Sequence, residues 1–341
     1  MSDLWITLGP ASIDIVDTLL EQGVSGVRLT FSFGTPQLQL DRARELKRVA
    51  ASVGRDCTVV ADLQGEKVRL GEFLGEPSFD VKAGDELRIA CLEAADIATT
   101  GVLPVRNKAF VASLRPGADL VIGDGAAIIE IVGTAGAYVT ARVTAGGTIN
   151  QTRGITVRNS EFEPSSLTDE DRSNLEFVAA HPEFDIVALS FVSSPTDVMM
   201  ARSILDEHGR AVPIVAKIES AAGIAAIDEI CVHSDMIMAA RGDLALTLPW
   251  IDLPGAVATI AEAAAKHQTP WILATQIVEG LERFAFPTRA EICDLAHWTQ
   301  QGCSAVMLSY ETVFGSNALG AVQCAKAVMD RWSRRPAIQR S

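Results

Sequence analysis

Three charged residues follow two apolar segments of the chain and have side chains that suit ligand chemistry. Lys217 and Glu219 follow the apolar run 214–216, and Asp243 follows the apolar run 236–239. Short runs without polar positions are typical of parallel strands that are buried on both faces. Ligands of α/β folds bind where such strands end, at the carboxyl edge of the sheet. We therefore expect the three side chains to lie at one ligand-binding edge.

The spacing of these residues suggests a metal and a phosphate or enolate. Lys217 and Glu219 are two positions apart, so their side chains leave an extended strand on the same side. Glu219 and Asp243 could then share one divalent cation, since magnesium prefers oxygen ligands and keeps several waters. A neighbouring lysine neutralises charge on a transferring phosphoryl group. Gly242 allows a close backbone approach, so the amides of Gly242 and Asp243 could hold a carboxylate at a helix N-terminus. The alternative interpretation is a structural ion pair at a strand end.

Strand-like and helix-like segments alternate along most of the chain. Eight short apolar segments, each followed by a helical pattern, predict an α/β fold of the (β/α)8 TIM-barrel type rather than an open sheet. The predicted strands are 5–8, 26–29, 58–61, 186–189, 214–216, 236–239, 271–274 and 305–308. Ser12 is expected to cap the first helix, and Thr288 with Glu291 to form a capping box. The residues expected to line the active face are Arg28, Asp62, Lys217, Glu219, Asp243, Thr275, Ser309 and Glu311.

The alternation stops between residues 71 and 153. This segment contains short strand-like stretches, such as 120–122 and 138–143, and glycine-rich turns such as 123–125. The pattern predicts a small β-barrel domain inserted after the third strand. We therefore predict a catalytic barrel formed by residues 1–70 and 154–336, with residues 71–153 as a lid.

Composition limits the classes of partner. Of the 341 residues, 48% are hydrophobic, which is ample for a large core, and the formal charge of -14 argues against nucleic acid or an anionic membrane as a partner. No signal peptide or membrane-spanning run is evident, so a cytoplasmic location is expected. The cysteines and histidines lack zinc-ligand spacing.

Motifs spread over the chain resemble, in order and spacing, those of the pyruvate kinase family. The resemblance covers about residues 3–333, including the inserted domain. The matching motifs are 6–12 (ITLGPAS), 27–34 (VRLTFSFG), 61–69 (ADLQGEKVR), 216–219 (AKIE), 239–244 (AARGDL), 274–276 (ATQ), 287–291 (PTRAE) and 307–312 (MLSYET).

The resemblance implies roles for the charged cluster. In that family the barrel binds phosphoenolpyruvate, and the inserted domain closes over a nucleotide. Glu219 and Asp243 would bind Mg²⁺ or Mn²⁺, which also holds the substrate carboxylate. Lys217 and Arg28 would contact the transferring phosphoryl group, and Thr275 would lie in the proton-transfer path near the enolate carbon. The amides that hold the carboxylate would be those of Ala240, Gly242 and Asp243.

One departure from the family concerns the monovalent cation. Ser32 and Asp62 match monovalent-cation ligands, but Lys67 stands where the family usually has a glutamate. A lysine stands at this position in potassium-independent members, where its ammonium supplies the positive charge. The resemblance therefore predicts that potassium is not required.

Other departures concern the nucleotide. Phe33 and Leu38 stand where the family has polar or aromatic nucleotide contacts. In the inserted domain only Arg153 keeps the charge of a usual Lys-Lys-Gly-Val-Asn pattern, although Arg69 and Pro10 remain. Pro10, Arg69 and Arg153 are thus weak candidates for binding ADP or ATP.

The eighth helical pattern of the predicted barrel ends near residue 335, close to the end of the 341-residue chain, whereas a full member of the family continues with a C-terminal regulatory domain. We expect that domain and its sugar-phosphate effector site to be absent. Any homo-oligomer would then form through barrel surfaces.

Three functions remain open from the sequence. The first is a pyruvate kinase-like phosphotransferase that moves a phosphoryl group between phosphoenolpyruvate and a nucleoside diphosphate. The second is a paralogue that uses the same metal–enolate site on another 2-oxo or 2-hydroxy acid, or in a specialised biosynthetic step, by phosphotransfer, decarboxylation or aldol-type cleavage. The third is a non-catalytic binding module. The intact charged cluster favours the first two, and the altered nucleotide contacts favour the second.

Overall fold

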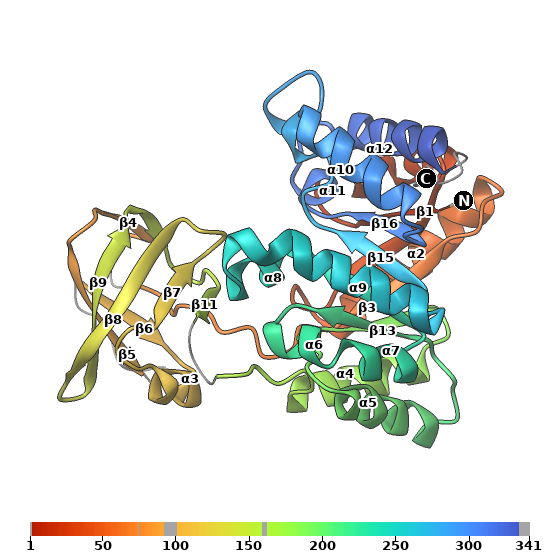
Figure 1. Cartoon of the computed structure of the whole chain (residues 1–341). Coiled ribbons are helices and arrows are strands. Elements are labelled where there is room, and N and C mark those ends of the chain that lie inside the picture. Colours follow the sequence, from red (N-terminus) through yellow and green to blue (C-terminus); the bar gives the residue numbers. More distant parts are fainter. Residues whose placement is uncertain (1, 74, 92–100, 159–161, 334–341) are drawn as a thin grey trace. The chain divides into compact units, whose positions relative to one another are not determined.

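The computed structural model describes residues 2–73, 75–91, 101–158 and 162–333 (Figure 1). The chain divides into two compact units. The first contains the N-terminal segment up to Gly65, Ser165–Leu244, and the C-terminal segment from Asp252. The second contains Glu66–Pro164 and the short segment Ala245–Ile251.

A closed barrel of parallel strands forms the centre of the first unit. Its neighbours follow the chain order, and the last strand pairs with the first, so the sheet has no free edge. The predicted (β/α)8 barrel is confirmed within the described residues. Its strands are β1 (Asp3–Thr7), β2 (Val24–Thr30), β3 (Thr58–Asp62), β12 (Ile186–Leu189), β13 (Ile214–Ile218), β14 (Met236–Ala240), β15 (Trp271–Ala274) and β16 (Ala305–Leu308).

The interior of the barrel is filled by apolar side chains, including Trp5, Val60, Val215 and Met238. Gly26 on β2 makes room for the largest of them, since a Cβ atom at Gly26 would lie 2.5 Å from the indole of Trp5. Alternate residues of a strand face the same side. Residues two positions further along these strands therefore point into the barrel as well, closer to its carboxyl end. Asp62 and Lys217 stand two positions after Val60 and Val215, so apolar strands present charged groups there.

Helices surround the barrel and connect its strands (Figure 1). The capping box predicted at Thr288 and Glu291 is confirmed. Ser12 does occupy the N-cap position of the first helical turn, but its hydroxyl accepts a hydrogen bond from the Gly9 amide and does not cap the helix, which corrects the prediction. The α-helices are α1 (Val16–Glu21), α2 (Pro36–Ser52), α4 (Asp169–Ala180), α5 (Pro195–Glu207), α6 (Ala221–Ala225), α7 (Ile227–His233), α8 (Arg241–Thr247), α9 (Leu253–His267), α10 (Arg289–Gln300), α11 (Tyr310–Val313) and α12 (Ala318–Trp332), and the 3-10 helices are η1 (Ile13–Ile15), η2 (Trp250–Asp252) and η3 (Glu279–Glu282).

The second unit is a separate β structure inserted between β3 and α4. Its strands form a six-stranded sheet in the order β11-β7-β8-β9-β5-β6 and a two-stranded sheet of β10 and β4. Leu103, Phe110, Ile129 and Val143 lie in its own hydrophobic core. The elements are β4 (Ser78–Val81), β5 (Glu86–Cys91), β6 (Val102–Val105), α3 (Lys108–Ser113), β7 (Asp119–Ile122), β8 (Ala127–Ala135), β9 (Tyr138–Ala145), β10 (Gly147–Asn150) and β11 (Ile155–Arg158).

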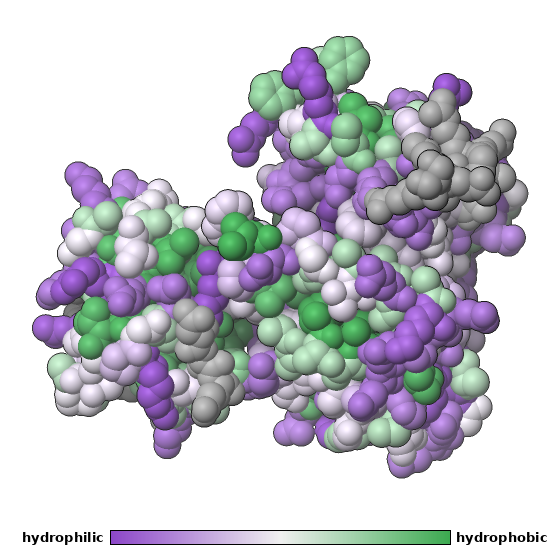
Figure 2. All heavy atoms as spheres, viewed as in Figure 1, coloured by the Kyte–Doolittle hydropathy of each residue, from purple (hydrophilic) through white to green (hydrophobic). Residues whose placement is uncertain are grey.

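The surface agrees with the composition. Hydrophilic residues cover much of the face shown in Figure 2, in keeping with 43 acidic and 29 basic residues in the chain. Within the described residues, no helix combines the length and apolar character needed to span a membrane.

Candidate functional site

The predicted charged residues meet at the carboxyl ends of the central strands. The Lys217 ammonium lies 3.2 Å from Oδ1 of Asp62 and 3.3 Å from Oε1 of Glu219. Arg28, two residues before the end of β2, lies 3.7 Å from Oδ2 of Asp62. Four side chains from β2, β3 and β13 thus form one alternating cluster of charges. The predicted same-side arrangement of Lys217 and Glu219 is confirmed by the distance between them.

A serine that sequence reasoning did not identify completes the contacts of the lysine. Ser190 directly follows β12, and its hydroxyl oxygen lies 2.6 Å from the Lys217 ammonium while donating a hydrogen bond of 2.7 Å to the carbonyl of Leu63. The next amide, of Phe191, donates a 2.8 Å hydrogen bond to Oε2 of Glu219. The sequence did contain a signal for Ser190, because it is the first polar residue after a buried strand. Lys217 and Asp243 likewise lie near the ends of buried strands.

Burial makes the charges of this cluster depend on one another. Burial lowers the pKa of Lys217, but the charges of Asp62 and Glu219 more than offset this, so its pKa lies above the ordinary value. Burial also raises the pKa of Glu219; Lys217 acts in the opposite direction, and the charge of Asp243 raises it further. The acidic neighbours of Lys217 therefore favour its charged form, whereas burial disfavours the charged form of Glu219 and Lys217 offsets part of that effect.

Glu219 and Asp243 are the two carboxylates that the sequence predicts as ligands of a divalent cation. Burial is the main reason why the pKa of Glu219 is raised, and the nearby charge of Asp243 adds to it; a shared cation would compensate both carboxylates. No group of three or more His, Cys, Asp or Glu side chains with metal-binding geometry occurs among the described residues. Two carboxylates leave most of the coordination shell to water and substrate oxygens, which is how Mg²⁺ is usually held.

Arg28 has a hydrogen-bond donor available for a ligand. Its Nε–H group is buried and has no hydrogen-bond partner among the described residues. A buried guanidinium donor without a partner is costly, and an anionic ligand oxygen would satisfy it. Arg28 and Lys217 both contact Asp62, so an oxygen bound near Arg28 also enters the field of the lysine.

Thr275 follows β15 in an unusual backbone conformation. Its φ is +74°, and that of Gln276 is +53°, although neither is glycine. Such conformations cost about 1–3 kcal/mol each and persist only where the surroundings hold them. The side chain of Thr275 lies against Gly242, where a Cβ atom would come within 3.3 Å of the threonine methyl group and 3.5 Å of its hydroxyl oxygen. The glycine after β14 therefore allows the threonine side chain to lie over the start of α8.

The remaining predicted residues belong either to turns of the first unit or to the second unit. Ser32 is half-buried in the turn after β2, and Pro10 is exposed after β1. Lys67, Arg69 and Arg153 belong to the second unit. There, Arg69 donates to the carbonyl of residue 152 over 3.4 Å, and the carbonyl of Arg153 accepts from the amide of residue 70.

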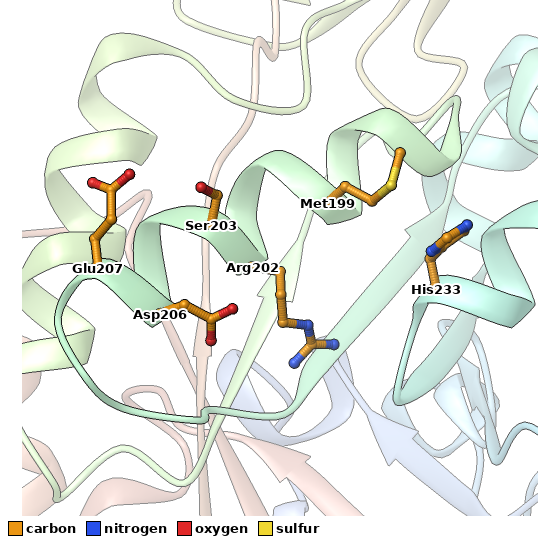
Figure 3. Close-up of a pocket in the computed structure, with 6 residues that line it drawn as sticks. All are labelled: Met199, Arg202, Ser203, Asp206, Glu207 and His233. Carbon is orange, nitrogen blue, oxygen red and sulfur yellow. The ribbon is translucent and has the colours of Figure 1, made fainter.

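A cavity of about 530 Å³ on the outside of the barrel is not this site (Figure 3). It is lined by residues of α5, among them Arg202, and by His233 of α7. Arg202 contacts the carbonyl of Val212, two residues before β13, and the carboxylate of Asp235, directly before β14. The cavity thus lies at the amino ends of the strands, where TIM barrels rarely carry chemistry.

Comparison with known proteins agrees with this geometry. Residues 2–322 match the family model described as "Pyruvate kinase, barrel domain". The chain belongs to the pyruvate kinase family. Among curated relatives, the pyruvate kinases of Corynebacterium efficiens, Mycobacterium intracellulare and Thermotoga maritima are 33%, 34% and 29% identical over 95%, 95% and 94% of this chain. The chain covers 68%, 68% and 69% of those proteins, respectively.

The expected resemblance and the expectation of a phosphotransferase enzyme are therefore confirmed at the level of the family. The residues that match the family model, 2–322, include the inserted β structure after β3.

Proposed function

We propose that the chain catalyses magnesium-dependent phosphoryl transfer between phosphoenolpyruvate and a nucleoside diphosphate. The observation that carries the proposal is the cluster of Lys217 and Arg28 around Asp62, with the buried Nε–H of Arg28 lacking a partner. Two fixed cations at the carboxyl end of a barrel, one with a spare donor, suit a phosphoryl group whose negative charge must be stabilised during transfer.

In this proposal each residue of the cluster has a separate task. A bound magnesium ion would supply positive charge to the substrate's carboxylate and enolate oxygens, and Glu219 and Asp243 would hold it. Arg28 would donate to a phosphoryl oxygen, and Lys217 would neutralise charge that develops between donor and acceptor. The amides that would bind the substrate carboxylate are those of Ala240, Gly242 and Asp243.

Thr275 would act in proton transfer at the enolate carbon. Its hydroxyl lies over Gly242, next to the proposed carboxylate amides, and is therefore close to where the three-carbon acid would bind. The positive φ of Thr275 supports this role, because strained backbone of this kind is concentrated at functional sites.

We also propose that potassium is not required. Asp62, which matches a monovalent-cation ligand, already contacts both Lys217 and Arg28 and has little need of a third cation. Lys67 would supply further positive charge, and Ser32 would remain as a half-buried hydroxyl. Equal rates in potassium and in sodium salts of the same ionic strength are expected; strong activation by potassium would contradict this.

The decisive experiment is a coupled lactate assay with phosphoenolpyruvate, magnesium and ADP. We expect turnover that disappears when EDTA is added and returns with excess Mg²⁺. A folded protein that binds magnesium yet shows no turnover would rule the proposal out.

A paralogous reaction at the same metal–enolate site is the second candidate. It is favoured by the exposed apolar side chains of Phe33, Leu38 and Tyr310, which are 61%, 41% and 49% exposed at the carboxyl end of the barrel. The first two stand at the family's nucleotide contacts, which leaves Pro10, Arg69 and Arg153 as the proposed nucleotide-binding residues. Titration with ADP and ATP distinguishes the two, because absence of binding would favour the paralogue acting on another 2-oxo or 2-hydroxy acid.

A further inference from the structure

The segment that carries Thr275 is held by one arginine that the sequence did not single out. Arg241 is the first residue of α8 and lies beside β15, because Ala240 pairs with Ala274. Its guanidinium donates to three successive carbonyls, those of residues 274, 275 and 276. The shortest of these hydrogen bonds, Nη2 to the carbonyl of Thr275, is 2.6 Å.

The arginine is itself fixed in place. Its side chain is only 12% exposed, and Nη1 lies 2.5 Å from Oδ2 of Asp294 on α10. Asp294 in turn accepts a 2.8 Å hydrogen bond from the indole of Trp298. A planar guanidinium has five donors in a fixed fork and is better suited to bridging neighbouring carbonyls than the compact ammonium of a lysine.

A buried carboxylate holds the other end of the same segment. Oε1 of Glu311 accepts from the amides of Ile277 and Val278 at 2.9 and 3.1 Å, and Oε2 accepts from the amide of Ser309. The positively charged Arg241 thus binds the carbonyls of residues 274–276, and the negatively charged Glu311 binds the amides of residues 277 and 278. Between these two anchors lie Thr275 and Gln276 with their positive φ angles.

We propose that Arg241 is a positioning residue, which holds the backbone of Thr275 in its left-handed conformation and so aims the threonine hydroxyl at the substrate. The positive φ is unfavourable for a β-branched residue, and the chain would relax toward an ordinary conformation without the three carbonyl contacts. Relaxation would move the hydroxyl away from Gly242. The inference rests on the proposed function, since proton transfer by Thr275 is part of it.

The test compares Arg241→Gln with a matched control, Arg202→Gln. Arg202 also pairs with an aspartate, Asp235, at 2.6 Å and contacts a carbonyl, but it lies at the amino ends of the strands. Both variants remove an arginine–aspartate ion pair, and Arg241→Gln should lose more thermal stability because Arg241 is the more buried of the two. Only Arg241→Gln should slow the exchange of pyruvate methyl protons with solvent, by about 10- to 100-fold, because small misplacements of a reacting group cost factors of this size. The KM for the three-carbon acid should change little.

A double-mutant cycle separates positioning from a structural role. In a Thr275→Ala background, Arg241→Gln should cost less than about threefold, because its effect is exerted through the missing hydroxyl. Equal losses in both backgrounds, or unchanged proton exchange in Arg241→Gln, would overturn the proposal.

Amide hydrogen exchange gives a readout that does not require turnover. The amides of Ile277 and Val278 should exchange faster in Arg241→Gln and should be unchanged in Arg202→Gln. If the wild-type protein lacked both phosphoryl transfer and methyl-proton exchange, the proposed function would fail. Amide exchange would then still decide whether Arg241 holds the segment that carries Thr275. Unchanged exchange of these amides in Arg241→Gln would reject the inference.

Discussion

Replacing Lys217 by methionine keeps an unbranched side chain that is one atom shorter and removes its charge. The ammonium lies 3.2 and 3.3 Å from two carboxylates, and the side chain is only 9% exposed, so water screens it weakly. Removing one preorganised donor aimed at developing charge typically lowers kcat by about 10²–10³-fold. We expect Lys217→Met to lower the kcat of phosphoryl transfer by at least that factor.

The same change should destabilise the fold moderately. Removing one partner of a buried ion pair costs about 3–5 kcal/mol when the other is left alone. Here Asp62 keeps Arg28 at 3.7 Å, and Glu219 keeps the amide of Phe191 at 2.8 Å. We therefore expect a loss of about 2–3 kcal/mol, which for a unit of this size lowers Tm by about 4–12 °C. Saturating Mg²⁺ should restore part of the lost stability, because the bound cation would compensate the negative charge of the carboxylates that Lys217 leaves behind.

The assay is coupled lactate formation, with metal binding measured by calorimetry. The matched control is Lys47→Met, since Lys47 lies 2.5 Å from Asp185 and donates to the carbonyl of Cys57, at the amino ends of the strands. The control should lose some stability and keep its kcat. A Lys217→Met enzyme with kcat within tenfold of wild type would refute the role assigned to the lysine.

Three further predictions follow from the same geometry. Glu219→Gln should raise the magnesium concentration needed for half-maximal activity by at least 10- to 100-fold, measured by metal titration; an unchanged requirement would remove Glu219 from the metal site. Gly242→Ala places a methyl group 3.3 Å from Thr275 Cγ2 and should slow turnover about threefold to tenfold. It should not lower Tm, since alanine suits a helix better than glycine. Normal turnover would show that Thr275 tolerates the displacement. Burial raises the pKa of Cys303 to about 12, above its value in the unfolded chain, so the stability it contributes is complete below about pH 9 and is lost as pH rises toward 12. A denaturation series from pH 8 to 11 should show this fall in stability. A thiol reagent at pH 8 should modify the exposed Cys293 well before the buried Cys303, and equal labelling of the two would contradict the burial of Cys303.

Much of the barrel was predictable because its strands are short, apolar and separated by regular helical patterns. All eight predicted strands overlap strands of the closed barrel. The pairing of Lys217 with Glu219 followed from the two-residue period of a strand alone. The cap at Ser12 was wrong in detail, because a local turn competes for the same hydroxyl.

Other contacts were not predictable from local patterns. Ser190 reaches Lys217 from a different strand, and Arg241 binds carbonyls that lie 33 to 35 positions further along the chain. Neither contact leaves a periodic signal, because it depends on which strands become neighbours when the barrel closes. The positive φ of Thr275 is equally invisible, since threonine has no intrinsic preference for it.

The sequence by itself determined the alternating architecture, the inserted β structure and the charged residues that end the strands, because these depend on periodicity and on residue type. The tertiary structure decided which of these charges meet, how Asp62 is shared between Lys217 and Arg28, and how Arg241 and Glu311 hold the strained segment of Thr275. The physical reason is that hydrogen bonds and charge interactions act over a few ångströms, and only the closed barrel brings residues so distant in the chain within that range.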